Sequence, residues 1–554
     1  MRAKRKQNGL QLQAIAGTYV VLLGWDILDA DLKDGLLGFA IRREDKTEGE
    51  TYWLRGMKSF PSTPLAPGEN ASTHEQPIQS FQWGDYSAKP DHEYTYTLIP
   101  MYGAPGALTD GKSVSIDVQT EHESGDPHGV FFNRGAVASQ EYVRRFGDKF
   151  PRDVGPAAYQ WLSRGLFEAF LAFLDEAKDD TCALRAAVYQ FQWPDALAGF
   201  KAAKARGVDV RVLFDAVDNT KQDPVKKNDA AIADAKIKSL CQGLTEGTLF
   251  HNKFIVLLKN GTPTAVWTGS TNLTENGIFG QLNVGHRIRD AAVAKAYLDY
   301  WNEMQDDPGT KAIKPWCDEE TPVPKNPPPS GASVVFSPQS KLDTLQRYAD
   351  IADRAKKGLF MTFAFGMHKD FQKVYEQNDG VLRFSLMEKE GNGAQLAQGK
   401  IDIRRIRKLP NVIVAIGHNI AMNEFDRWVK EPSGATPTAN VHWIHTKCML
   451  VDPLGNDPIV ITGSANFSEA STNRNEENMV IVRGDTRLAD IFLGEFMRSF
   501  SHYAFREAVY IWTMSGKTEE WRPNDLKTRA QDWLPQYFRK GSEEALKRTF
   551  FSGQ

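Results

Sequence analysis

The chain has 554 residues, of which 41% are apolar and 25% are charged, the proportions of an ordinary globular protein. This length is too great for one hydrophobic core and predicts about three domains. The formal net charge of −3 and the pI near 6.4 exclude a global electrostatic attraction to nucleic acid or anionic lipid, although they allow a local basic groove.

The first 125 residues have the pattern of a small all-β domain. Short segments rich in β-branched and aromatic residues, such as TYVVLLGWDI and EYTYTLIPMYG, are separated by turns rich in Gly, Pro and Asp. This pattern is typical of an antiparallel sandwich, and HEYTYTLIPMYG resembles the late strands of a fibronectin type III module. We interpret residues 1–125 as a shielding or adaptor domain that carries no chemistry.

The N-terminus, MRAKRKQNGLQLQAIAG, is charged, but Gln11 and Gln13 interrupt the apolar run that a secretory signal requires. Other apolar runs are shorter than the roughly 20 residues that span a bilayer. The four cysteines are widely spaced and form no C-x-x-C pair, which favours reduced thiols. We therefore expect a soluble, cytoplasmic protein. The cysteines are Cys182, Cys241, Cys317 and Cys448.

From about residue 127 the chain alternates strands and helices. ALRAAVYQFQ and VDVRVLFDA have the composition of buried strands, and PDALAGFKAAKARG between them has that of a helix opened by Pro and closed by Gly. A second series follows the Pro-rich segment ETPVPKNPPPSGAS, which is typical of a linker. In that series KKGLFMTFAFGM and VLRFSLME repeat DTCALRAAVYQFQW and VDVRVLFD. The chain therefore contains an internal duplication of about 190 residues.

Both copies carry the same polar cassette. His251 and Lys253 in the first correspond to His445 and Lys447 in the second, and a Gly-Ser-x-Asn sequence begins 18 residues after each His. A lone His on a strand is usually structural, but agreement at five offsets within diverged halves indicates a shared catalytic function. The Gly-Ser-x-Asn sequences contain Ser270 and Asn272 in the first copy, and Ser464 and Asn466 in the second.

These cassettes resemble the paired HKD motifs of the phospholipase D superfamily, and the resemblance covers roughly residues 127–505. It implies two duplicated α/β lobes packed as a pseudo-dimer around a central active site. The second motif has its Asp at Asp452, whereas Leu258 occupies that place in the first. In that family the Asp supports the fold more than it touches substrate, so its loss concerns local structure more than chemistry.

We therefore expect an α/β protein preceded by a small all-β sandwich. The predicted divisions are a sandwich at 1–125, a first lobe at 127–317, a Pro-rich linker at 318–333, a second lobe at 334–505 and a C-terminal helical extension at 506–554.

The chemistry of a phosphodiester explains why such a site needs two histidines. The negative charge of the diester repels anionic nucleophiles, so a neutral imidazole attacks phosphorus while a second, protonated imidazole supplies the proton of the leaving alcohol. Charge on the non-bridging oxygens then requires cations and amide donors, the expected role of Lys253, Lys447, Asn272 and Asn466. Ser270 and Ser464 could also donate to these oxygens, or they could only form a tight turn. No metal or other cofactor is required.

The cassettes differ 32 residues after each His, where similar family members place an acid that hydrogen-bonds the imidazole. The first cassette has Asn283 there and the second has Glu477. If each is the partner of the His in its own cassette, only His445 has a carboxylate that favours its charged form. This predicts His251 as the nucleophile and His445 with Glu477 as the general acid and base. The alternative is that either His can attack.

The substrate class stays open between three hypotheses. Both cassettes lie on one chain, so a complete site can form within a monomer, as in phospholipases and transferases of this superfamily, which favours a phospholipid. Aromatic segments such as FQWPD, FDRWVKEP and QDWLPQYF could form a rim for transient contact with a membrane surface. A nuclease is the alternative, because basic clusters such as IRRIRKLP could follow a phosphate backbone. An inactive phosphate-binding module is the second alternative, which Leu258 and Asn283 would explain.

Overall fold

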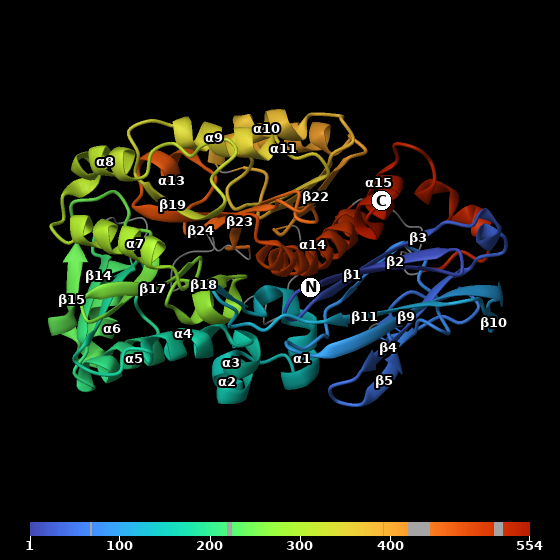
Figure 1. The fold of residues 1–554 in the computed structure, drawn as a ribbon, viewed down its shortest axis with the longest axis horizontal. Coiled ribbons are helices and arrows are strands. Elements are labelled where there is room, and N and C mark those ends of the chain that lie inside the picture. The colour runs from blue at the N-terminus through green and yellow to red at the C-terminus, as the bar shows by residue number, and fades with distance from the viewer. Residues whose placement is uncertain (67–68, 219–223, 392, 419–443, 515–524) are drawn as a thin grey trace.

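A computed structural model describes residues 1–66, 69–218, 224–391, 393–418, 444–514 and 525–554. A β-rich N-terminal part packs beside two α/β lobes (Figure 1). The long helix α14 (Thr486–Met514) contacts strands of the N-terminal part and of both lobes. Within these ranges, no helix combines the length and the apolar character needed to cross a bilayer.

Two antiparallel sheets form the N-terminal all-β part. One has the order β1-β2-β3-β8, with β1 (Arg2–Gln7), β2 (Leu10–Ala16), β3 (Val21–Ile27) and β8 (Gln82–Asp85). The other has the order β10-β9-β4-β5 with β11 beside β9; its strands are β4 (Gly38–Asp45), β5 (Glu50–Trp53), β9 (Glu93–Ala104), β10 (Ala107–Asp110) and β11 (Val114–Gln119). A short pair, β6 (Arg55–Gly56) and β7 (Ala71–Ser72), lies apart from both. Buried side chains such as Trp25, Phe39 and Tyr96 form one apolar core here. The fibronectin type III resemblance stays a prediction.

The β1–β2 hairpin lies in N-terminal residues for which the sequence analysis assigned no strand. Asn8 and Gly9 join the two strands with φ of 52° and 76°. An Asn-Gly pair favours the left-handed conformation that a two-residue hairpin turn requires. The Gln residues that interrupt the apolar run belong to β2, and the hairpin could have been predicted from this dipeptide.

Each lobe is built on a seven-stranded mixed sheet, and the two sheets have the same topology. The orders are β12-β18-β17-β16-β13-β14-β15 and β19-β25-β24-β23-β20-β21-β22, so every strand of the first has a counterpart in the second. The duplication predicted from the sequence is therefore confirmed at the level of the fold. The strands of the first lobe are β12 (His128–Phe132), β13 (Cys182–Val188), β14 (Asp209–Asp215), β15 (Cys241–Leu244), β16 (Lys253–Lys259), β17 (Thr262–Gly269) and β18 (Val284–Ile288). Those of the second are β19 (Gly331–Ser337), β20 (Gly358–Phe363), β21 (Leu382–Met387), β22 (Val412–Ile416), β23 (Lys447–Val451), β24 (Ile459–Gly463) and β25 (Glu477–Arg483).

Helices cover these sheets, and apolar side chains of both lobes and of α14 belong to one continuous core. The helices of the first lobe are α1 (Ser139–Phe146), α2 (Pro151–Val154), α3 (Pro156–Ser163), α4 (Leu166–Leu174), α5 (Pro194–Ala205), α6 (Val225–Ala235), α7 (Ala291–Met304) and α8 (Gly309–Glu320). Those that follow are α9 (Asp343–Ala352), α10 (Lys369–Tyr375), α11 (Leu396–Ile406), α13 (Glu469–Asn473), α14 (Thr486–Met514) and α15 (Glu543–Ser552). Helix α14 continues through the expected boundary at residue 505.

The C-terminal segment ties the sandwich to the second lobe. Trp533 and Tyr537 are buried in the sandwich core. Farther on, Phe550 of α15 packs against Phe360 of β20, and Arg548 forms an ion pair with Asp26 of β3. The C-terminal segment therefore packs against both the sandwich and the second lobe.

Asp452, the Asp of the second motif, directly follows β23. Its carboxylate accepts hydrogen bonds from the backbone N–H groups of Lys356, Lys357 and Gly358 at 2.7–3.1 Å, and so fixes the loop that leads into β20. In the first lobe β16 runs two residues farther and ends in a turn at Asn260, while Leu258 lies in the apolar core beside a β-bulge. The longer strand and its own turn replace the role of the missing Asp.

We expect Asp452→Ala to lower the free energy of unfolding by about 2 kcal/mol, because it leaves three backbone donors without their charged acceptor. Chemical denaturation measures this change. Asp457→Ala is the matched control in the same loop, because Asp457 is 58% exposed and pairs only with Arg483 at the surface among the described contacts. An equal loss in both variants would contradict the anchoring role.

Candidate active site

The two cassettes meet at the junction of the lobes. Lys253 is the first residue of β16 and Lys447 the first of β23, and each of these strands lies at the centre of its sheet. His251 and His445 precede them by two residues, and their ring centroids are 6.3 Å apart. All four side chains are buried. The duplicated fold therefore places the two imidazoles opposite one another, as the resemblance implies.

Each imidazole is hydrogen-bonded by a residue of the other lobe, and this corrects our prediction. Nδ1 of His251 lies 2.7 Å from Oε2 of Glu477, and Nδ1 of His445 lies 2.9 Å from Oδ1 of Asn283. From the sequence we paired each His with the residue in its own cassette. The carboxylate thus belongs to His251 and the amide to His445, the reverse of that assignment.

Backbone pairing between the lobes explains the exchange. Phe250 forms a parallel bridge with Glu476, and Leu282 forms one with Ile444. These residues directly precede the histidines and their partners. The N–H of His251 donates to the carbonyl of Glu476 at 2.9 Å, and that of His445 donates to the carbonyl of Leu282 at 3.1 Å. The next residue on each strand is therefore brought beside the imidazole of the opposite lobe.

The acceptors fix where each imidazole carries its proton. Glu477 is an acceptor when ionised, and His445 Nδ1 faces two acceptors, the carbonyl of Ser270 and Oδ1 of Asn283. The Asn283 amide cannot be reversed without losing the bond from Nδ2 to the carbonyl of Gly277 at 2.7 Å. Both imidazoles therefore hold a proton on Nδ1, and Nε2 is the atom left for the reaction.

The two partners give the histidines different electrostatic surroundings. Burial lowers the pKa of His251 to about 4, although Glu477 acts in the opposite direction. Burial also acts to raise the pKa of Glu477, but the interactions with His251 and Lys253 outweigh it and lower that pKa. Asn475 donates to the second carboxylate oxygen at 3.1 Å and orients it. His251 is therefore neutral at pH 7 beside an ionised carboxylate.

The lysines are poised for an anion. Each ammonium donates to the carbonyl of the His two residues before it at 2.6 Å. Burial lowers the pKa of Lys447 to about 7 and lowers that of Lys253 well below its usual value, with partial compensation from Glu477. A phosphate anion beside them would stabilise their charged forms.

The Gly-Ser-x-Asn sequences form equivalent turns, in which both serines hydrogen-bond within the protein. Ser270 Oγ donates to Asn283 Oδ1 at 2.7 Å and accepts from the Val284 N–H, while Ser464 Oγ accepts from the Asn478 N–H at 3.0 Å. Both serines are fully buried. These bonds correct the prediction of serine contacts to phosphate and support the alternative of a tight turn.

The asparagines of the same turns have unused hydrogen-bonding capacity. Oδ1 of Asn272 and Oδ1 of Asn466 are both buried and have no hydrogen-bond partner among the described residues. Buried amides are nearly always satisfied, so a symmetric pair of exceptions beside the histidines indicates a place for a ligand or water.

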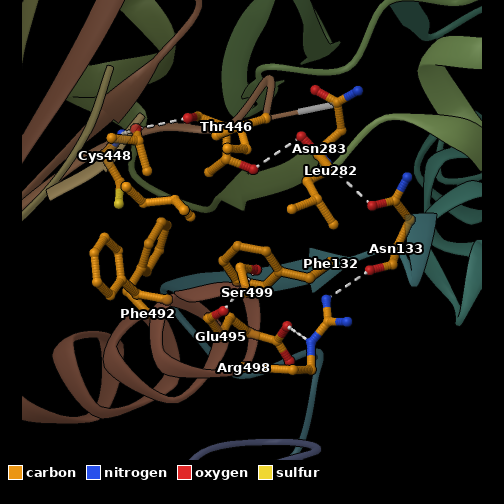
Figure 2. A pocket seen from close by; sticks show the side chains of 14 residues that line it. Phe132, Asn133, Leu282, Asn283, Thr446, Cys448, Phe492, Glu495, Arg498 and Ser499 are labelled. Atoms are coloured by element: carbon orange, nitrogen blue, oxygen red, sulfur yellow. Dashed lines mark hydrogen bonds and ion pairs between the residues drawn. The ribbon is translucent and has the colours of Figure 1, made fainter. Parts of the chain in front are cut away.

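A mainly apolar cavity lies behind Asn283 at the junction of the lobes, and Asn133 projects from its wall (Figure 2). Oδ1 of Asn133 accepts from the Asn283 N–H at 3.0 Å, and Nδ2 donates to the carbonyls of Ile278 and Gln281. Asn133 thus holds the loop that presents Asn283 to His445. Neither motif points to Asn133, because it follows β12 and lies outside both of them.

The aromatic segments suggested as a membrane rim are largely internal. Phe191 of FQWPD is buried in the first lobe, and Trp533 of QDWLPQYF is buried in the sandwich. FDRWVKEP lies outside the described residues. Cys448 is in the core, where burial raises the pKa of its thiol to about 12, and all four cysteines are free.

The chain has two α/β lobes of identical topology, and the histidine motifs face one another where the lobes meet. It is therefore a duplicated, two-lobed protein. Residues 170–305 and 415–500 match the family model described as "Cardiolipin synthase, PLD-like domain". Parts of both lobes therefore match a phospholipase D-like domain, in agreement with the resemblance of the two motifs.

Three solved structures resemble this chain at low sequence identity. Phosphatidylserine synthase from Haemophilus influenzae Rd KW20 is 13% identical, with 64% of this chain and 91% of that chain covered and a TM-score of 0.40. Yeast tyrosyl-DNA phosphodiesterase is 13% identical, with 57% and 87% covered and a TM-score of 0.35. Polyphosphate kinase from Porphyromonas gingivalis is 12% identical with a TM-score of 0.40; 68% of this chain matches only 52% of that one. These similarities are too low to assign an activity. No curated protein matches the chain.

Proposed function

We propose that this chain is a metal-independent phosphodiester hydrolase or transferase that acts through a phosphohistidine intermediate on His251, with a phospholipid as its substrate. The observation that carries the proposal is the exchanged pairing of the two imidazoles, His251 with Glu477 and His445 with Asn283. It supports the roles that we predicted for the histidines, but for a different physical reason.

Attack on phosphorus moves positive charge from one imidazole to the other. The Nε2 lone pair of His251 forms the N–P bond, and its ring becomes cationic as it does so. Glu477 accepts from the opposite ring nitrogen at 2.7 Å and stabilises this cation. His251 is therefore the imidazole that gains most from a carboxylate partner.

His445 is suited to give up a proton. Its Nδ1 proton is held by neutral oxygens of Ser270 and Asn283, which orient the ring without stabilising the imidazolium as a carboxylate would. As the P–O bond breaks, its electron pair goes to the leaving oxygen, and the Nε2 proton of His445 follows. In the second step His445 takes a proton from water or an alcohol, whose oxygen attacks phosphorus and returns the N–P electron pair to His251.

The remaining groups are matched to the anionic phosphate. Lys253 and Lys447 supply cations on the two sides of the site, and the Nδ2 groups of Asn272 and Asn466 are the proposed donors to the non-bridging oxygens. Their unpartnered Oδ1 atoms can accept from water or from the attacking alcohol. Because the cross-lobe pairs join residues of one chain, the site is complete without a second copy. This supports the monomeric arrangement expected from two motifs in one sequence.

Two observations support a phospholipid as the substrate. The matching family model is described by the name of a cardiolipin synthase, which favours a phospholipid. In the basic cluster suggested for nucleic acid, Arg405 pairs with Glu376 and Arg407 pairs with Glu507, so two of its charges are neutralised within the protein. Hydrolysis and transfer to an alcohol share the same intermediate.

The test offers the purified protein phosphatidylcholine and cardiolipin vesicles in one set of assays and single- and double-stranded DNA and RNA in another, each with and without excess EDTA. We expect release of a lipid head group that chelation leaves unchanged, and intact nucleic acid. The double variant His251→Ala/His445→Ala controls for contaminating activity. Cleavage of nucleic acid alone would replace the phospholipid by the nuclease alternative. Loss of activity in EDTA, restored by a divalent ion, would overturn metal independence, and binding of vesicles without turnover would favour an inactive module.

A further inference from the structure

Two buried acids outside both motifs occupy equivalent places in the two lobes. Val188 of β13 pairs with Phe214, and its counterpart Phe363 of β20 pairs with Met387. The residues that follow are Asp215 and Glu388, each about 1% exposed. The duplication has therefore kept a carboxylate at the end of the same strand, although its length differs between the lobes.

Both carboxylates face the backbone directly before a motif histidine. Oε2 of Glu388 accepts from the N–H of Ile444 at 3.0 Å. Asp215 accepts from the N–H of Val217 at 2.9 Å, and the N–H of Phe250 faces the same carboxylate and acts to lower its pKa. The next residues are His445 and His251, so each acid lies one peptide away from an imidazole.

The geometry of the crossing strands explains why these acceptors are needed. The N–H of each histidine points to the other lobe, where Glu476 or Leu282 accepts it. Successive N–H groups of an extended chain point to opposite sides, so those of Phe250 and Ile444 point back into their own lobes. A buried N–H without an acceptor costs free energy. Glu388 supplies that acceptor in the second lobe, and Asp215 faces the equivalent N–H in the first.

We propose that Asp215 and Glu388 are positioning residues that clamp the backbone before His251 and His445 and so set the placement of the two imidazoles. The Ile444–His445 dipeptide is held from both sides, by the hydrogen bond to Glu388 and by the bridge to Leu282. The Phe250–His251 dipeptide has the equivalent bridge to Glu476, with Asp215 on its other side. Reacting groups must be held within roughly 0.5 Å of their productive positions, so release of one side lowers turnover without removing a group that touches substrate.

The clamp depends on a hydrogen-bond acceptor and not on charge. Burial raises the pKa of Asp215 to about 7, with its backbone hydrogen bonds and Lys253 acting to lower it. A protonated carboxyl group keeps a carbonyl oxygen that accepts as well. An amide of the same length therefore preserves the clamp, whereas an apolar side chain of similar size removes it.

The experiment compares Asp215→Asn with Asp215→Leu, and Glu388→Gln with Glu388→Met, in the full chain. We expect the Leu and Met variants to lose at least tenfold in kcat with KM within twofold of the original, and the amide variants to stay within threefold in both. Thermal unfolding shows whether each variant is folded. If Asp215→Leu does not fold, Asp215→Ala replaces it. Amide variants as slow as the apolar ones would overturn the clamp, and so would apolar variants with full kcat.

Hydrogen exchange separates this inference from the proposed function, on which its kinetic consequence rests. The amides of Phe250 and Ile444 are expected to exchange at least tenfold faster in the apolar variant of their own lobe, and at the original rate in the amide variant. If the unmodified protein has no phosphodiesterase activity, the proposed function is wrong. The exchange rates of these two amides still test the clamp in that case. Unchanged exchange in the apolar variants would overturn the clamp whatever the activity.

Discussion

His251→Ala is expected to lower turnover by about 10⁴-fold or more and to abolish the phosphoenzyme, because it removes the atom that forms the N–P bond. The buried Nε2 of His251 has no substitute, since the lysines donate to backbone carbonyls and His445 is held by its own acceptors. Quenching the original enzyme during turnover, followed by denaturing mass spectrometry, should locate on His251 a phosphoryl group that keeps the remaining ester of the substrate.

His445→Ala supplies the contrasting result. With a nitrophenyl diester the leaving group departs without a proton, so the first step still proceeds, whereas activation of water in the second step lacks its base. The phosphoenzyme on His251 should therefore accumulate in this variant, and with an alkyl diester it should form slowly. Phosphate on His445 in the original enzyme, or no accumulation in His445→Ala with the activated diester, would reverse the roles.

The lobes and their motifs were predictable because both depend on residues that lie close together in the sequence. Strand and helix composition defines the repeated units, and equal offsets from each His to its Lys and Asn survive where the rest of the two halves diverges. The equal topology of the two sheets follows from that duplication. Leu258 was also recognisable as a departure, but the longer strand that compensates for it was not.

The partners of the histidines were not predictable from spacing alone. Asn283 and Glu477 are both 32 residues from the His of their own cassette, yet Phe250–Glu476 and Leu282–Ile444 bridges bring them to the other one. Pairing between lobes joins residues more than 160 positions apart, and no local pattern encodes it. The role of Asp215 and Glu388 was not predictable for the same reason, because their equivalence appears only in the strand register.

Glu477→Gln is expected to lower kcat by about 10²-fold or more. Glutamine can still accept the Nδ1 proton of His251, but a neutral amide does not stabilise the cationic ring that forms as phosphorus is attacked. The pKa of His251 should move as well. The Glu477 anion stabilises the imidazolium and so raises this pKa, which lies at about 4. Its removal lowers the pKa further, and the acidic limb of kcat/KM should shift to lower pH.

Asn283→Asp is the complementary change. Together with Glu477→Gln it distinguishes pairing of each His with a residue of the other lobe from pairing within its own cassette. A carboxylate in place of the Asn283 amide stabilises the imidazolium of His445, so His445 holds its proton to higher pH and becomes a weaker acid. The alkaline limb should shift upward, and turnover of alkyl diesters should fall more than that of nitrophenyl diesters. If each residue instead acted on the His of its own cassette, Glu477→Gln would move the alkaline limb and Asn283→Asp the acidic one. Full profiles of kcat/KM against pH for both variants decide between these outcomes.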